Sequence, residues 1–154
     1  MINIAHIHPM LVHFPIVLFI TAVVLDAYII SRGSDLGRRD CLVMTAFGAL
    51  AIGLVFALGA AFFGDIALDK AVDAGFSADP LEEHELLATL TIGIFFVLAL
   101  VQGFVLWRRR SLTGGRGWLF ALAGLAGLGL LISTAYHGGN LVYELGVNVT
   151  GVKP

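Results

Sequence analysis

The fold is decided by residues 41–63, which read CLVMTAFGALAIGLVFALGAAFF and contain no charged side chain. A helix rises about 1.5 Å per residue, so about 20 apolar residues are enough to cross the hydrocarbon core of a bilayer. Lipid cannot hydrogen-bond exposed backbone groups, whereas a helix satisfies its own. Residues 41–63 are therefore predicted to form a transmembrane helix.

Three further apolar runs have the same character and cover residues 10–30, 86–107 and 118–136. Hydrophobic residues make up 58% of the 154-residue chain and charged residues 13%, with a mean hydropathy of +0.94. A soluble domain of this size could not bury so much apolar surface. We predict one all-α domain over residues 1–154, an integral membrane four-helix bundle with a C-terminal tail over residues 138–154.

The charges between these runs predict the orientation of the bundle. Arginines occur only between the first and second runs and between the third and fourth: Arg32, Arg38, Arg39, Arg108, Arg109, Arg110 and Arg116. Acidic residues dominate the other ends: Asp65, Asp69, Asp73, Asp79, Glu82, Glu83, Glu85 and Glu144. Short arginine-rich loops stay in the cytoplasm. Both termini are therefore expected on the outer side of the membrane.

Small residues recur at four-residue spacing in two of the runs. The second run contains Ala49, Gly53, Ala57 and Ala61, and the last contains Gly117, Ala121, Gly129, Ser133 and His137, with Leu125 as a bulky member. Such stripes let helix backbones approach closely, so helix packing is one interpretation. The other is that the stripe leading to His137 makes room for a flat cofactor.

The chain has five histidines, His6, His8, His13, His84 and His137. The predicted topology places all of them at the outer end, on three different helices, with His6 a solvated terminal residue. Polar side chains at membrane depth are costly and indicate function. Imidazole commonly holds haem iron, and the core of a helix bundle is a common cofactor site. The pattern predicts a non-covalent haem b held by two histidines.

His13 and His84 are the first-choice axial ligands of the haem iron, because both lie about one turn inside a helix start. His137 is an alternative ligand or a neighbour of the ligands, and His8 is held in reserve. Each also has a plainer interpretation as a solvated, capping or interfacial residue. Pro15 is expected to kink the start of the first helix, because it has no amide to donate.

Other chemistries have weaker support in the sequence. Zinc or copper would accept three histidines, or two with a carboxylate, but no HExxH motif is present. Cys41 is the single cysteine, which excludes an internal disulfide and covalent haem attachment through CxxCH. There is no GxSxG motif, no phosphate loop and no basic aromatic stretch for nucleic acid. We expect an electron carrier or a subunit of an oxidoreductase complex.

Two stretches carry a resemblance to a known family. Residues 8–16 read HPMLVHFPI, and residues 138–147 read GGNLVYELGV. With Asp26, and with a histidine that follows an acidic loop, they resemble the bacterial membrane family catalogued as domain of unknown function 2231. The resemblance covers nearly the whole chain and matches His8, His13, His84 and His137. It implies four helices in a bacterial inner membrane and a redox setting, although Asn148 and Ile66 depart from the family pattern.

These observations lead to one expected function and one alternative. We expect a membrane-bound haem b protein that passes electrons between a quinol or another membrane redox subunit and a periplasmic carrier. The alternative is an accessory structural subunit of a larger membrane complex, whose histidines are interfacial or bind a structural metal. A transporter is less favoured, because Asp26 is the only charged residue within the predicted spans.

Overall fold

The computed structural model describes residues 7–149 and Gly151, so His6 lies outside the described residues. The elements are α1 (Ile7–Leu11), α2 (His13–Ser31), α3 (Cys41–Asp73), α4 (Ala78–Trp107) and α5 (Gly114–Tyr143). No β-strand occurs in this described part. Four segments, the first formed by α1 with α2, are long and apolar enough to cross a membrane. The predicted all-α membrane fold is therefore confirmed.

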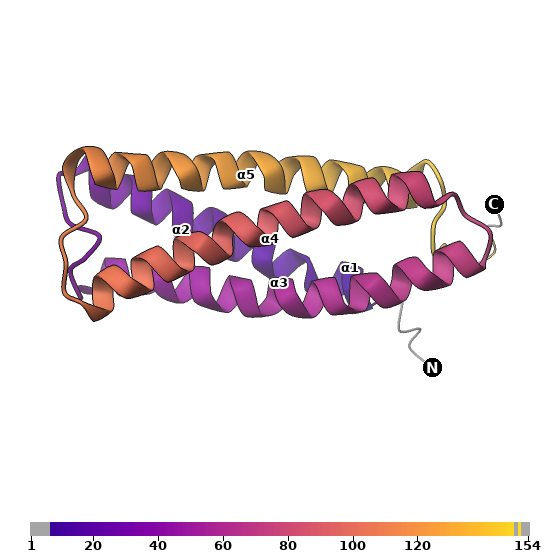
Figure 1. The fold of residues 1–154 in the computed structure, drawn as a ribbon, viewed down its shortest axis with the longest axis horizontal. Coiled ribbons are helices and arrows are strands. Elements are labelled where there is room, and N and C mark those ends of the chain that lie inside the picture. The colour runs from indigo at the N-terminus through magenta and orange to yellow at the C-terminus, as the bar shows by residue number, and fades with distance from the viewer. Residues whose placement is uncertain (1–6, 150, 152–154) are drawn as a thin grey trace.

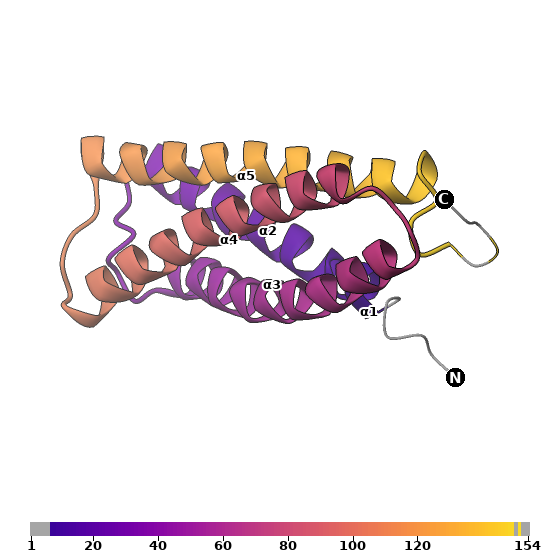
Figure 2. The same cartoon turned by 45° about the vertical axis from the view of Figure 1, so that its right-hand side comes forward.

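The four long helices lie side by side as an elongated bundle (Figures 1 and 2). Each of α2, α3, α4 and α5 packs on two neighbours, in the cyclic order α2, α3, α4, α5, and α1 packs on α3. Helices α2 and α4 therefore face each other across the centre. One end of the bundle carries the loops 32–40 and 108–113 and is here called the arginine end. The other carries α1, the α3–α4 turn and the end of α5, and is called the histidine end.

The start of the first span is broken at Val12, between α1 and α2. Pro15 has no backbone N–H and leaves the carbonyl of Leu11 without its helical partner. The hydrogen-bond ladder resumes beside the break, where Ile16 N donates to Val12 O at 3.3 Å. This interruption lies one turn before Pro15, near the place where the sequence predicts a kink.

The helices extend beyond the predicted spans at the histidine end. Helix α3 continues to Asp73, α4 already begins at Ala78 and α5 continues to Tyr143. Most of the predicted acidic loop, and the beginning of the predicted tail, are therefore helical. The 33 residues of α3 span about 50 Å, more than the hydrocarbon core of about 30 Å. The first charged residues mark the end of the segment that can lie in the hydrocarbon core, but the helix itself continues beyond them.

A small second core closes the histidine end. It consists of buried residues from the α3–α4 region, the end of α5 and the segment after it: Ala71, Leu81, Leu141 and Val147, with Leu68 and Phe76 packed against them. Asn148 Nδ2 also donates to the carbonyl of Ala67 at 3.2 Å. The segment after α5, which the sequence predicts as a tail, packs on α3 over its described residues.

The main core joins helices across the bundle. Phe19 of α2 and Phe95 of α4 stack with ring centroids 4.0 Å apart, and each is no more than 1% exposed. Gly53 of α3 packs so closely on α2 that an added Cβ would lie 2.9 Å from the Phe19 ring. The small residues of α3 therefore serve helix packing.

The stripe predicted on α5 is only partly buried. Gly117 and Ala121 are buried, but Leu125 and Gly129 are exposed. A strict four-residue spacing drifts around a helix that has about 3.6 residues per turn. The face of α5 that is buried continues instead through Gly124 and Gly127 to Leu131. A smooth path from Gly117 to His137 is therefore absent from α5.

Asp35 fastens the two loops of the arginine end to each other. Its Oδ1 accepts hydrogen bonds from the amides of Leu112 at 2.7 Å and Gly37 at 2.8 Å. Partial burial raises the pKa of Asp35, but these two amides, with Ser111 and the charge of Arg38, outweigh that effect and lower the pKa below its usual range. The ionised carboxylate is therefore the form that the folded loops favour.

Candidate functional site

Two imidazoles face each other at the histidine end. His8 lies in α1 and His84 lies in the first turns of α4. Their ring centroids are 6.3 Å apart, and the ring planes are almost perpendicular, at 88°. Two of the four predicted ligands, from segments far apart in the sequence, are thus brought together, and we call them the histidine pair.

Each ring of the histidine pair is held by a backbone carbonyl of a neighbouring helix. His8 Nδ1 lies 2.7 Å from the carbonyl oxygen of Ala60 in α3, and His84 Nδ1 lies 3.1 Å from that of Thr134 in α5. A carbonyl oxygen can only accept, so Nδ1 is the protonated nitrogen of both rings. In the neutral form of each ring, Nε2 carries the lone pair, which is the arrangement typical of metal-binding histidines, whose other nitrogen donates to the protein.

Two glycines let these rings approach the helix backbones. A Cβ added at Gly64 would lie 3.0 Å from His8 Nδ1, and a Cβ added at Gly138 would lie 2.9 Å from His84 Cε1. Any larger residue would therefore push the ring aside. In the sequence these glycines are recognisable only as parts of longer motifs, because their contacts are with distant residues.

A pair of threonines supports the carbonyl that holds His84. The Oγ1 atoms of Thr91 in α4 and Thr134 in α5 are 2.9 Å apart. Each hydroxyl also lies within hydrogen-bond distance of a carbonyl one turn earlier in its own helix, Leu87 O for Thr91 and Leu130 O for Thr134. Neither threonine is among the residues predicted for the site, although hydroxyl groups within apolar spans are a signal for interhelical contacts.

His137 lies near the histidine pair, but both nitrogens of its ring contact other residues. Its Nδ1 donates to the carbonyl of Ser133, one turn earlier in α5, at 2.9 Å. Its Nε2 is 3.4 Å from the carboxylate of Glu83, and its side chain is 31% exposed. This position matches the predicted role of a neighbour of the ligands better than that of a ligand.

His13 is exposed at the beginning of α2, and the ring opposite His84 belongs to His8. The reason is helical geometry. His13 follows His8 by five positions, which corresponds to a rotation of about 140° around a helix. The two side chains therefore cannot both point into the bundle, and sequence spacing alone gave no reason to prefer His8.

No larger ligand cluster accompanies the pair in residues 7–149. Within these residues, no three or more His, Cys, Asp or Glu side chains are grouped so that they could hold a metal ion. A zinc site built only from protein ligands usually has at least three. The donor set present here is two imidazoles on different helices.

Comparison with known proteins defines the family of the chain. No curated protein and no solved structure matches it. Residues 5–151 match the family described as "Predicted membrane protein (DUF2231)". The match includes the histidine pair, His137 and both glycines, and it agrees with the resemblance of the opening and closing motifs. The chain belongs to this family of predicted membrane proteins.

Proposed function

We propose that this protein binds haem b at the histidine end, with His8 and His84 as axial ligands, and that it transfers electrons there. The observation that carries the proposal is the histidine pair, in which Nδ1 of each ring is held by a backbone carbonyl, so that Nε2 is the nitrogen left for a metal. The axial pair differs from that expected from the sequence, because His8 takes the place of His13.

The donor set fits haem in the number of ligands that the protein must supply. A porphyrin supplies its own equatorial nitrogens, so two imidazoles complete the coordination of the iron. The two rings come from different helices and lie close together. The centroids of the histidine pair are 6.3 Å apart. Zinc or copper is a weaker alternative, because such ions need further ligands from the protein.

The residues around the pair would position and tune the ligands. The carbonyls of Ala60 and Thr134 fix the tautomer and orientation of the two rings. Gly64 and Gly138 provide the space in which those rings lie. The bound haem would supply one-electron redox chemistry. The contribution of the chain is to hold two imidazoles in a fixed orientation through their Nδ1 atoms.

The location of the site follows from the positive-inside rule. Arginine-rich short loops remain in the cytoplasm, so the histidine end would face the periplasm of a bacterial inner membrane. Electron partners at that depth would be a quinol or another membrane redox subunit and a periplasmic carrier. An accessory subunit of a larger complex is the rival function. The exposed apolar side chains do not favour it, because lipid covers them equally well.

Absorption spectra of the purified protein and four variants test the proposal. The wild-type protein, produced with sufficient haem, is expected to show a Soret band and sharp visible bands after reduction with dithionite. His8→Ala and His84→Ala should each lose most of the bound haem. His13→Ala is the matched control, since His13 is exposed. It should keep the wild-type spectrum, and His137→Ala should keep haem with an altered midpoint potential.

Two outcomes would overturn the proposal. One is a colourless wild-type protein that takes up no haem on reconstitution while its helical content is intact. The other is a haem spectrum that survives in both His8→Ala and His84→Ala. Loss of haem in His13→Ala but not in His8→Ala would restore the pair expected from the sequence.

A further inference from the structure

A second polar pair is buried between α2 and α4, towards the arginine end of the bundle and away from the histidines. Asp26 of α2 is 3% exposed and Gln102 of α4 is fully buried. Gln102 Nε2 donates to Asp26 Oδ1 at 3.1 Å, which links two helices that face each other across the bundle. Gln102 Oε1 is the one buried side-chain oxygen or nitrogen of the described residues that has no hydrogen-bond partner.

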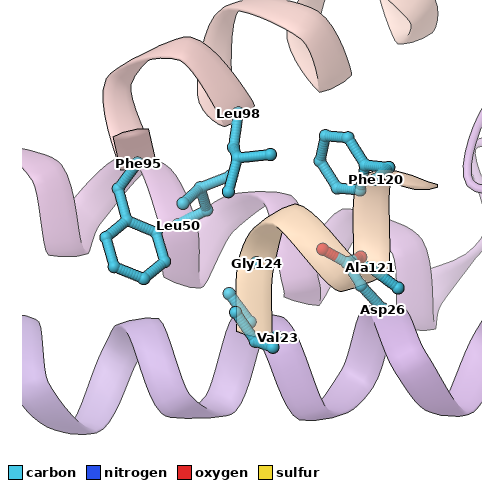
Figure 3. A pocket seen from close by; sticks show the side chains of 9 residues that line it. Val23, Asp26, Leu50, Phe95, Leu98, Phe120, Ala121 and Gly124 are labelled. Atoms are coloured by element: carbon cyan, nitrogen blue, oxygen red, sulfur yellow. The ribbon is translucent and has the colours of Figure 1, made fainter. Parts of the chain in front are cut away.

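The cavity beside Asp26 does not provide a water molecule that could hydrogen-bond to its carboxyl group. A cavity of about 10 Å³ adjoins the carboxyl group and is otherwise lined by apolar side chains and Gly124 (Figure 3). This volume is at the limit for one water molecule, and a buried water needs about three polar partners. Asp26 is the only polar side chain in the lining. The cavity is therefore expected to be dry.

None of the described residues that line the cavity beside the carboxyl group carries a positive charge. The lining contributes Leu50 from α3, Phe95 and Leu98 from α4, and Phe120, Ala121 and Gly124 from α5. None of these can be titrated, and Gln102 is neutral. An isolated carboxylate in such surroundings is strongly unfavourable, and a buried acid responds by taking up a proton. A protonated carboxyl, in contrast, offers one O–H donor that needs an acceptor.

We propose that Asp26 is a proton-binding site, protonated at neutral pH, and that Gln102 Oε1 accepts its hydrogen bond. The acid and the amide then pair through two hydrogen bonds, from Gln102 Nε2 to Asp26 and from Asp26 to Gln102 Oε1. The second bond satisfies the oxygen of Gln102 that is otherwise without a partner. The site is independent of haem, because no residue of the histidine pair takes part.

Infrared spectroscopy of the full chain in lipid nanodiscs tests this proposal. A protonated carboxyl group has a carbonyl-stretch band that carboxylates lack. The wild-type protein is expected to show this band at pH 7, and Asp26→Asn should remove it. Asp69→Asn is the matched control, since Asp69 is an exposed carboxylate of α3. It should leave the band unchanged. Gln102→Leu should keep the band but shift its frequency, because the O–H group loses its acceptor.

The variants also separate a proton site from a purely structural contact. Asn keeps a donor and an acceptor at position 26, so Asp26→Asn should melt close to the wild-type temperature, whereas Asp26→Leu should melt lower. Absence of any band that depends on Asp26 at pH 7 would overturn the proposal. A band unchanged by Gln102→Leu would overturn the role of Gln102 as acceptor. Neither result depends on whether haem binds at the histidine end.

Discussion

At the scale of single residues, two glycines determine whether the imidazoles can lie against the helices. Gly138 touches His84 from α5, and Gly64 touches His8 from α3. A Cβ added at Gly138 would lie closer to the His84 ring than real Cβ atoms approach, and one added at Gly64 would require the His8 ring to shift slightly. Both rings are fixed by hydrogen bonds to carbonyls. The position of the histidine pair therefore depends on residues that carry no functional group.

Gly138→Ala is expected to displace the ring of His84 and to reduce the haem bound per protein several-fold. Gly93→Ala, in α4, is the control, because an added Cβ there meets nothing within 4 Å. Both changes replace glycine by a better helix former, so neither should weaken its helix. The measurement is the ratio of haem to protein after reconstitution. Equal haem content in the two variants would contradict the role given to Gly138.

The histidines also show where prediction from sequence ends. Their gathering at one end of the bundle follows from topology, and His8, His84 and His137 are indeed found there. The facing pair does not follow, because it depends on the break at Val12 and on the phase of α1 relative to α4. The sequence also does not identify the carbonyls of Ala60 and Thr134 as the acceptors for the two rings, because every residue has a backbone carbonyl.

At the scale of the elements, apolar runs predict the existence of the helices but not their ends. Charged residues such as Asp65 and Asp69 end the stretch that lipid accepts, yet a helix continues in water or headgroups when it has something to pack on. At the histidine end, the helix extensions pack on the small core around Leu81 and Leu141. These contacts join segments distant in sequence, so they could not be inferred from local pattern.

The connection between the two arginine loops predicts a pH dependence of stability. Because folding lowers the pKa of Asp35, its contribution to stability is fully present above the unfolded value of about 3.9 and is lost as the pH falls through the lower folded value. The melting temperature of the wild-type protein should fall over this range more steeply than that of Asp35→Asn. Asp69→Asn serves as the control and should follow the wild type. Parallel curves for wild type and Asp35→Asn would contradict the prediction.

At the scale of the whole molecule, the two ends of the bundle differ in charge and in chemistry. The arginine end has seven arginines, while the described part of the histidine end has Lys70 as its only lysine or arginine and carries the imidazole pair. The orientation of the bundle therefore decides on which side of the membrane a bound haem would exchange electrons. The charge difference predicts that the arginine end is cytoplasmic.

Cys41 offers a direct test of that orientation, because it is the single cysteine and is exposed at the arginine end of α3. A maleimide that cannot cross membranes is expected to label it in inverted inner-membrane vesicles and not in spheroplasts. Combining Cys41→Ala with Asp73→Cys moves the thiol to the other end of the same helix and should reverse the pattern. Labelling of Cys41 in spheroplasts, with Asp73→Cys protected there, would place the histidine pair in the cytoplasm. The bundle and the histidine pair would be unaffected by this result, but the proposed electron partners would have to be cytoplasmic.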